Sequence, residues 1–117
     1  MLFNKCILGI SETWLDDSFD SSKLNVSGYP QPFRREDMSH SCGSMLYIAE
    51  NIPARRKKQF EPAASEIICI ELQIKESKIL ICSCYRPQHR DMIDFCNDID
   101  TIIDSAAHQY QSFIFLW

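Results

Sequence analysis

Glycine and long apolar segments are scarce in this sequence. Its 117 residues include three glycines and five prolines, too few for a flexible low-complexity linker. No apolar run approaches the ~20 residues that a bilayer-spanning helix needs. Residues 1–5 lack the basic start and the long apolar stretch of an export signal. We therefore expect an intracellular protein, nuclear or cytoplasmic, that is neither secreted nor inserted in a membrane.

Positive charge is also in the minority. Twelve lysines and arginines stand against sixteen aspartates and glutamates, which gives a formal net charge of -4. This balance argues against a protein surface that is basic all over and binds nucleic acid in that way. It is compatible with a local basic cleft. Hydrophobic residues make up 45% and charged residues 24% of the chain, which is an ordinary globular composition. The length suits one small domain with one hydrophobic core.

Six cysteines are many for a chain of this length, but none forms a Cys-x-x-Cys pair, so a structural zinc site has no support. Cys69, Cys82 and Cys84 lie in apolar, strand-like runs, and Cys96 lies on the apolar stripe of an expected helix. We interpret them as buried free thiols that act as small hydrophobic side chains. A disulfide framework is the alternative, and the missing export signal disfavours it.

Apolar runs predict strands over residues 6–10 and 43–49. Between them, residues 15–37 are polar and broken by glycine and proline, so we expect a long irregular connection there. A connection of that length in a compact domain is usually functional or disordered. The basic run 55–58 favours a solvated turn, with steering of nucleic acid or an import signal as the alternatives.

The second half of the chain shows clearer periodicity. Residues 66–74 alternate in polarity and are followed, after a short polar connection, by an apolar run over 79–85, which predicts an antiparallel hairpin. Residues 91–109 carry an apolar stripe at helical spacing, with Asp91 as the expected N-cap. Residues 112–117 predict a last strand. This order indicates a mixed α/β (α+β) fold in which at least one helix covers a sheet.

Several short motifs follow one another along the chain. They are ILGISETWL at 7–15, SGY at 27–29, FRR at 33–35, GSMLYI at 43–48, CYRP at 84–87 and FIFL at 113–116. Together they resemble the endonuclease/exonuclease/phosphatase family. The likeness is greatest to the reverse-transcriptase-associated endonuclease domains of non-LTR retrotransposons. It runs in the same order over nearly the whole chain.

The resemblance implies a deoxyribonuclease-I-like fold, a two-sheet α/β sandwich, and hydrolysis of DNA phosphodiester bonds with Mg²⁺ or Mn²⁺. Glu12 would be the carboxylate ligand of that ion and a catalytic residue, because Mg²⁺ binds one or two carboxylates and keeps several waters. Tyr85 matches the active-site tyrosine, whose hydroxyl approaches the phosphate. Arg86 would contact a phosphate oxygen, and Arg34 and Arg35 would contact the DNA backbone.

Other interpretations of these residues stand beside the resemblance. Tyr85 could be a core residue at a strand end with a satisfied hydroxyl group, although the resemblance favours the catalytic role. Arg34 and Arg35 could equally form a solvated turn. We expect Trp14 to contribute to packing rather than to chemistry.

The chain also departs from the family pattern. The family's triple glycine reads Ser41-Cys42-Gly43 here, so only the last glycine remains. Glycines in such a turn permit a positive φ or a close approach of another backbone. The chain begins after the strand that carries an active-site asparagine in the family. It ends where a Gly-Asp-Phe-Asn motif would follow Leu116, and before the aspartate-histidine pair that activates the nucleophile.

From these departures we expect residues 1–117 to form a partial domain that lacks its first strand and its C-terminal half. Such a fragment of a DNA endonuclease of the target-site-nicking type would be inactive by itself. DNA and other domains of a longer polyprotein would be its partners. The alternative is a non-catalytic relic that binds nucleic acid or protein, through the Arg34 and Arg35 region and the basic run.

Overall fold

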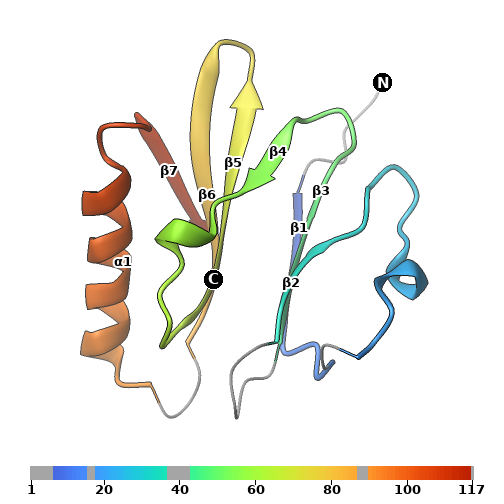
Figure 1. The fold of residues 1–117 in the computed structure, drawn as a ribbon, viewed down its shortest axis with the longest axis horizontal. Helices are drawn as coiled ribbons and strands as arrows, with labels where there is room; N and C mark the ends of the chain where they lie inside the picture. Colours follow the sequence, from blue (N-terminus) through green and yellow to red (C-terminus); the bar gives the residue numbers. More distant parts are fainter. Residues whose placement is uncertain (1–6, 16–17, 37–42, 87–89, 117) are drawn as a thin grey trace.

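Residues 7–15, 18–36, 43–86 and 90–116 are described by the structure, a computed structural model. Over these residues the fold is mixed α+β, with two β-sheets and one α-helix, which confirms the predicted class. Figure 1 shows helix α1 (Met92–Ala106), the four-stranded sheet and the three-stranded sheet as successive layers. The four-stranded sheet is therefore covered on both faces.

The three-stranded sheet has the order β1-β3-β2, and both of its pairings are antiparallel. Its strands are β1 (Ile7–Ser11), β2 (Phe33–Arg35) and β3 (Ser44–Ile48). β2 and a 3₁₀-helix, η1 (Ser21–Leu24), lie inside the segment that was expected to be irregular. The prediction was wrong there because a three-residue strand is too short to show an alternation, and its pairing partner β3 defines it.

The four-stranded sheet has the order β4-β5-β6-β7. Its strands are β4 (Ala54–Arg56), β5 (Glu66–Ile74), β6 (Ser77–Tyr85) and β7 (Ser112–Leu116). β5 and β6 form the predicted antiparallel hairpin, and β7 pairs in parallel with β6 after the chain has crossed through α1. Part of the basic run lies in β4 rather than in a turn.

The two faces of β5 and β6 belong to two separate apolar layers. One layer lies between the sheets and contains Leu46, Ile48, Ile68, Ile70, Leu72 and Ile81. The other lies under α1 and contains Ile67, Cys69, Leu80, Cys82, Cys84, Phe95, Ile102 and Ala106. Strand side chains alternate between faces, and here both faces are covered, so both sets are apolar.

Helix α1 begins as predicted at its N-cap. The Asp91 carboxylate accepts hydrogen bonds from the backbone amides of Ile93 (3.0 Å) and Asp94 (3.3 Å), which satisfies two amides that lack helical partners. The buried stripe is Phe95, Ile99, Ile102 and Ala106. The helix is neither long nor apolar enough to cross a membrane, and the described part of the chain holds no other candidate span.

Three of the cysteines confirm the prediction of buried free thiols: Cys69, Cys82 and Cys84. The sulfur atoms of Cys69 and Cys82 lie 3.6 Å apart across the hairpin, and burial raises the pKa of Cys84 to about 12. Cys96 is exposed, so its placement on the buried stripe was wrong; the stripe runs through Phe95, one residue around the helix. Cys6 and Cys42 lie outside the described residues.

Two arginines connect the sheets through polar contacts. Arg35, which is 7% exposed, extends from β2 and donates to the carbonyl oxygens of Ile67 (2.9 Å) and Pro62 (2.7 Å). Arg56 on β4 donates to the Arg34 carbonyl oxygen (2.8 Å) and forms two hydrogen bonds of 2.9 Å with the Glu61 carboxylate. Hydrogen bonds are directional and the hydrophobic effect is not, so these bonds help to fix the relative position of the two sheets.

Tyr110 gives the helix layer a pH-dependent contact. Its hydroxyl group donates to the Glu71 carboxylate on β5 at 2.5 Å, and this bond lowers the pKa of Glu71. The stabilisation is therefore present at neutral pH and is lost as the pH falls through the lowered pKa of Glu71.

We expect Tyr110→Phe to lower the free energy of unfolding by about 1 kcal/mol at pH ~7 and by less in acid, where Glu71 is protonated. Urea unfolding at several pH values measures the difference. Tyr47→Phe is the matched control, since the Tyr47 hydroxyl donates to the neutral Leu24 carbonyl oxygen (2.6 Å), and its cost should not vary with pH. Equal pH dependence of the two variants would contradict the prediction.

Candidate active site

The candidate site lies where strands of both sheets end at one edge. β1 ends at Ser11, which is paired with Ser44 at the start of β3. In the other sheet, β6 ends at Tyr85, which is paired with Glu66 at the start of β5. Four strand ends thus bring polar side chains to one end of the apolar layer between the sheets.

The two residues predicted to be catalytic contact each other. The Tyr85 hydroxyl group donates a hydrogen bond of 3.0 Å to Oε1 of Glu12, across 73 residues of sequence. Tyr85 follows Ile81 and Ser83 on the face of β6 that points to the other sheet, because Ile81 belongs to the layer between the sheets. The bond therefore joins one sheet to the other at an exposed position.

A left-handed turn carries Glu12 toward Tyr85. Glu12 has a φ of 57° and Trp14 a φ of 56°, a conformation that costs a side-chain-bearing residue about 1–2 kcal/mol. In a continued strand, Glu12 would follow Leu8 and Ile10 onto the outer face of the sheet. Backbone strain of this kind is concentrated at functional sites, so the turn supports a functional interpretation of Glu12.

Gly43 makes room for that turn. The Thr13 amide donates to the Gly43 carbonyl oxygen (3.2 Å), which holds the turn against the start of β3. A Cβ atom on Gly43 would lie 2.3 Å from the Thr13 hydroxyl oxygen, and Gly43 itself has a φ of 84°. Gly43 is thus required by both space and backbone conformation; Ser41 and Cys42, which precede it, lie outside the described residues.

Glu66 is a site residue that the sequence interpretation missed. It is fully buried, and its Oε1 accepts a hydrogen bond from the Ser44 hydroxyl group at 3.1 Å. Its other oxygen, Oε2, is buried and has no hydrogen-bond partner. The alternation of side chains along β5 could have indicated it. Glu66 shares one face of the strand with Ile68, Ile70 and Leu72, and a carboxylate is unusual on such an apolar face.

The three predicted arginines lie in different surroundings. Arg34 donates to the Glu36 carboxylate, to the Phe19 carbonyl oxygen (2.7 Å) and to the Ser21 hydroxyl group (2.7 Å). Arg35 is buried against carbonyl oxygens, and Arg86, next to Tyr85, donates to the Arg90 carbonyl oxygen (2.8 Å). These contacts show structural roles for Arg34 and Arg35, and contact with DNA stays a prediction for all three.

Trp14 is exposed rather than packed. Its side chain lies in the left-handed turn and is 72% exposed, which makes the expectation of a packing role wrong. Trp14 and Glu12 are two residues apart in the same turn, and both have left-handed backbone conformations. An exposed indole is able to stack on a planar ligand.

The chemistry of the cluster is that of oxygen ligands. Glu12, Tyr85, Ser44 and Glu66 offer carboxylate and hydroxyl oxygens, which are the donors that Mg²⁺ and Mn²⁺ prefer. Among the described residues, no group of three or more His, Cys, Asp or Glu side chains could hold a metal ion.

Compared with models of known protein families and with curated proteins, the chain shows no significant match.

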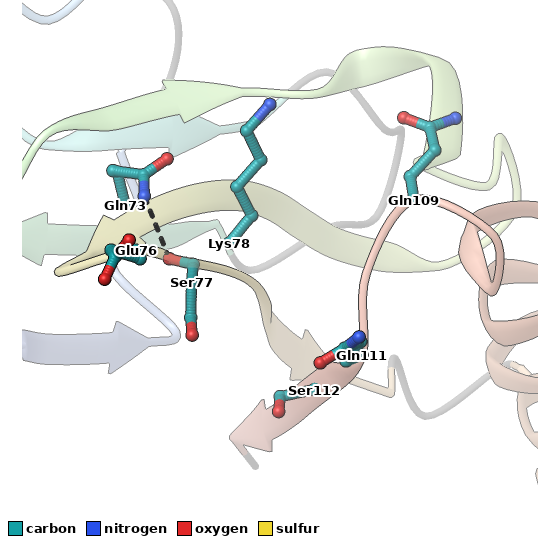
Figure 2. Close-up of a pocket in the computed structure, with 7 residues that line it drawn as sticks. All are labelled: Gln73, Glu76, Ser77, Lys78, Gln109, Gln111 and Ser112. Carbon is teal, nitrogen blue, oxygen red and sulfur yellow. Dashed lines mark hydrogen bonds between the residues drawn. The ribbon is translucent and has the colours of Figure 1, made fainter.

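A polar hollow lies at the opposite end of the four-stranded sheet, by the β5–β6 turn. It has a volume of about 320 Å³ and is lined by Gln73, Glu76, Ser77, Lys78, Gln109, Gln111 and Ser112. Figure 2 shows the Gln73 amide group directed at the Ser77 carbonyl oxygen, which it contacts at 3.3 Å. Gln73 thus stabilises the β5–β6 turn. The hollow lies one strand length from Glu66, on the order of 25 Å along β5.

We expect Gly43→Ala to destabilise the chain by about 2–4 kcal/mol, because the new methyl group meets Thr13 in a backbone conformation that alanine disfavours. In the double variant Thr13→Ala/Gly43→Ala, the steric conflict is removed and only the cost of the conformation, about 1 kcal/mol, should remain. Urea unfolding of the four members of this cycle measures the interaction. Additive effects of the two substitutions would contradict the proposed conflict.

Proposed function

We propose that the chain carries part of a divalent-cation-dependent site for cleavage of DNA phosphodiester bonds, within a deoxyribonuclease-I-like fold. The observation that supports this most is the 3.0 Å hydrogen bond between Tyr85 and Glu12. These two residues were selected by the resemblance to retrotransposon endonucleases, and they come from different sheets. The two-sheet architecture with a covering helix is compatible with such a fold.

Glu12 is the proposed cation ligand. Its carboxylate is exposed and stands at the mouth of the layer between the sheets, so an ion can reach it without displacing core side chains. Bound Mg²⁺ or Mn²⁺ would polarise a phosphoryl oxygen and neutralise part of the charge that develops there. Glu12 by itself would hold the ion weakly, because Mg²⁺ gives up its waters reluctantly.

Tyr85 is the proposed phosphate donor. In the free chain its hydroxyl proton is directed at Glu12. With a phosphodiester in place, the same proton would be donated to a phosphoryl oxygen, and the Glu12 oxygen would become available to the cation. Arg86 follows Tyr85 directly and is the arginine best placed to approach that phosphate, while Trp14 could stack on a neighbouring base.

These groups position and polarise a phosphodiester, but they do not activate the attacking water. A positioned general base is worth typically ~10²–10⁴-fold in rate, and neither Glu12 nor Tyr85 is free for that role in this scheme. We therefore propose that the chain binds the cation and DNA but does not turn over by itself. A non-catalytic binding module remains the alternative function.

The test is a comparison of wild-type chain with Glu12→Gln and Tyr85→Phe. We expect Mn²⁺ to strengthen binding to double-stranded DNA in the wild type, and Glu12→Gln to remove most of that effect, which corresponds to about a 10-fold loss or more in affinity for Mn²⁺. Tyr85→Phe should weaken DNA binding but leave Mn²⁺ affinity nearly unchanged. Fluorescence anisotropy of labelled DNA and calorimetric titration with Mn²⁺ measure the two quantities.

Glu76→Gln is the matched control, since it removes one carboxylate at the far end of β5. Salt-dependent DNA binding that ignores both Mn²⁺ and Glu12→Gln would favour the binding module instead. Supercoiled plasmid should stay intact with the wild-type chain and Mg²⁺. Nicking that disappears in Glu12→Gln would support the site and contradict the expected inactivity.

A further inference from the structure

We propose that Glu66 is a second carboxylate of the cation site, lying beneath Glu12 at the inner end of the cluster. The proposal rests on the proposed function, because it concerns the same ion. It starts from a buried oxygen atom, Oε2 of Glu66, that has no hydrogen-bond partner. Nearly all buried polar atoms in folded proteins have partners, so this one requires an explanation.

Glu66 is buried, so a charge on its carboxylate would have to be offset by a neighbouring group. The residue is 0% exposed, and among the described residues its carboxylate forms no ion pair with a lysine or arginine. Arg35, a buried arginine on β2, the strand paired with β3, donates to the Ile67 and Pro62 carbonyl oxygens. A carboxylate shielded from water needs a cation or a proton to offset its charge.

Two short structural routes connect Glu66 to Glu12. In the first, Glu66 is paired across the hairpin with Tyr85, whose hydroxyl group reaches Glu12. In the second, the Glu66 carboxylate accepts from Ser44, which is paired with Ser11, the residue before Glu12. Both routes lie on the faces that the two sheets turn toward each other, so Glu66 extends from β5 toward the other sheet at the end where Glu12 stands.

The surrounding donors favour a hard divalent cation over a softer metal. Glu12 and Ser44 supply oxygen atoms, and Ser83, which is 6% exposed, lies on the same face of β6 as Ile81. A cation held by Glu12 at the mouth of the cluster would have Glu66 behind it, either as a direct ligand or through one water. Two carboxylates would offset the two positive charges of Mg²⁺ or Mn²⁺, which Glu12 alone does not.

Mn²⁺ affinity of the full chain and its variants tests the assignment, by calorimetric titration. We expect Glu66→Gln to weaken Mn²⁺ binding by about 10–100-fold, because one of the two carboxylates is lost while the side-chain shape is kept. Glu76→Gln, which removes an exposed carboxylate of the hairpin turn, should leave Mn²⁺ binding unchanged.

The pattern across variants separates this proposal from the proposed function. If Glu12→Gln abolishes Mn²⁺ binding but Glu66→Gln retains it, Glu66 is not a ligand of the ion and the proposal fails alone. If Glu66→Gln abolishes binding but Glu12→Gln retains it, Glu66 is confirmed as a ligand and the assignment of Glu12 fails. If the wild-type chain does not bind Mn²⁺, both are overturned.

A measurement on the wild-type chain covers the case in which Glu66→Gln does not fold. With glutamate side-chain carboxyl carbons labelled and assigned by NMR, substoichiometric Mn²⁺ should broaden the signals of Glu66 and Glu12 and leave that of Glu76 sharp. Broadening of Glu12 together with a sharp Glu66 signal would overturn the proposal.

Discussion

Packing of the two sheets against each other is the constraint on which the candidate site depends. Glu12 directly follows β1 of the three-stranded sheet, and Tyr85 ends β6 of the four-stranded sheet, so no single sheet contains the site. The apolar layer that includes Leu46, Ile68 and Ile81 supplies the attraction. The Arg35 and Arg56 contacts restrict how the sheets can slide. Site geometry is therefore a property of the interface between the sheets.

Two features that are unfavourable for folding lie at the polar end of this interface. One is the left-handed turn at Glu12 and Trp14, and the other is the buried carboxylate of Glu66. Both have an energetic cost, and both lie at the place where strands from both sheets end. Local departures from good folding chemistry are expected at functional sites, where the rest of the structure compensates for them.

Regular elements with clear periodicity could be predicted from the sequence, because their own side chains specify them. The alternation over β5 and the Asp91 cap of α1 are examples. β2 and β4 could not, since three residues carry no period and their partners define them. Glu12 and Tyr85 were selected by resemblance, because no local pattern connects residues 73 positions apart. The burial of the Glu66 carboxyl group depends on packing against the three-stranded sheet, whose Ser44 contacts it, and this could not be predicted from the sequence.

The connectivity of the strands also sets an order of assembly. β5 and β6 are joined by a two-residue turn and pair over nine positions, so this hairpin can form within microseconds, on the ~1–10 μs scale of isolated hairpins. β7 must wait for α1 to form and cross, and β1 must find β3 across a long loop, which makes both pairings slower. We therefore expect the β5–β6 hairpin to form first and the contact between Glu12 and Tyr85 to form late, when the three-stranded sheet packs on the four-stranded one.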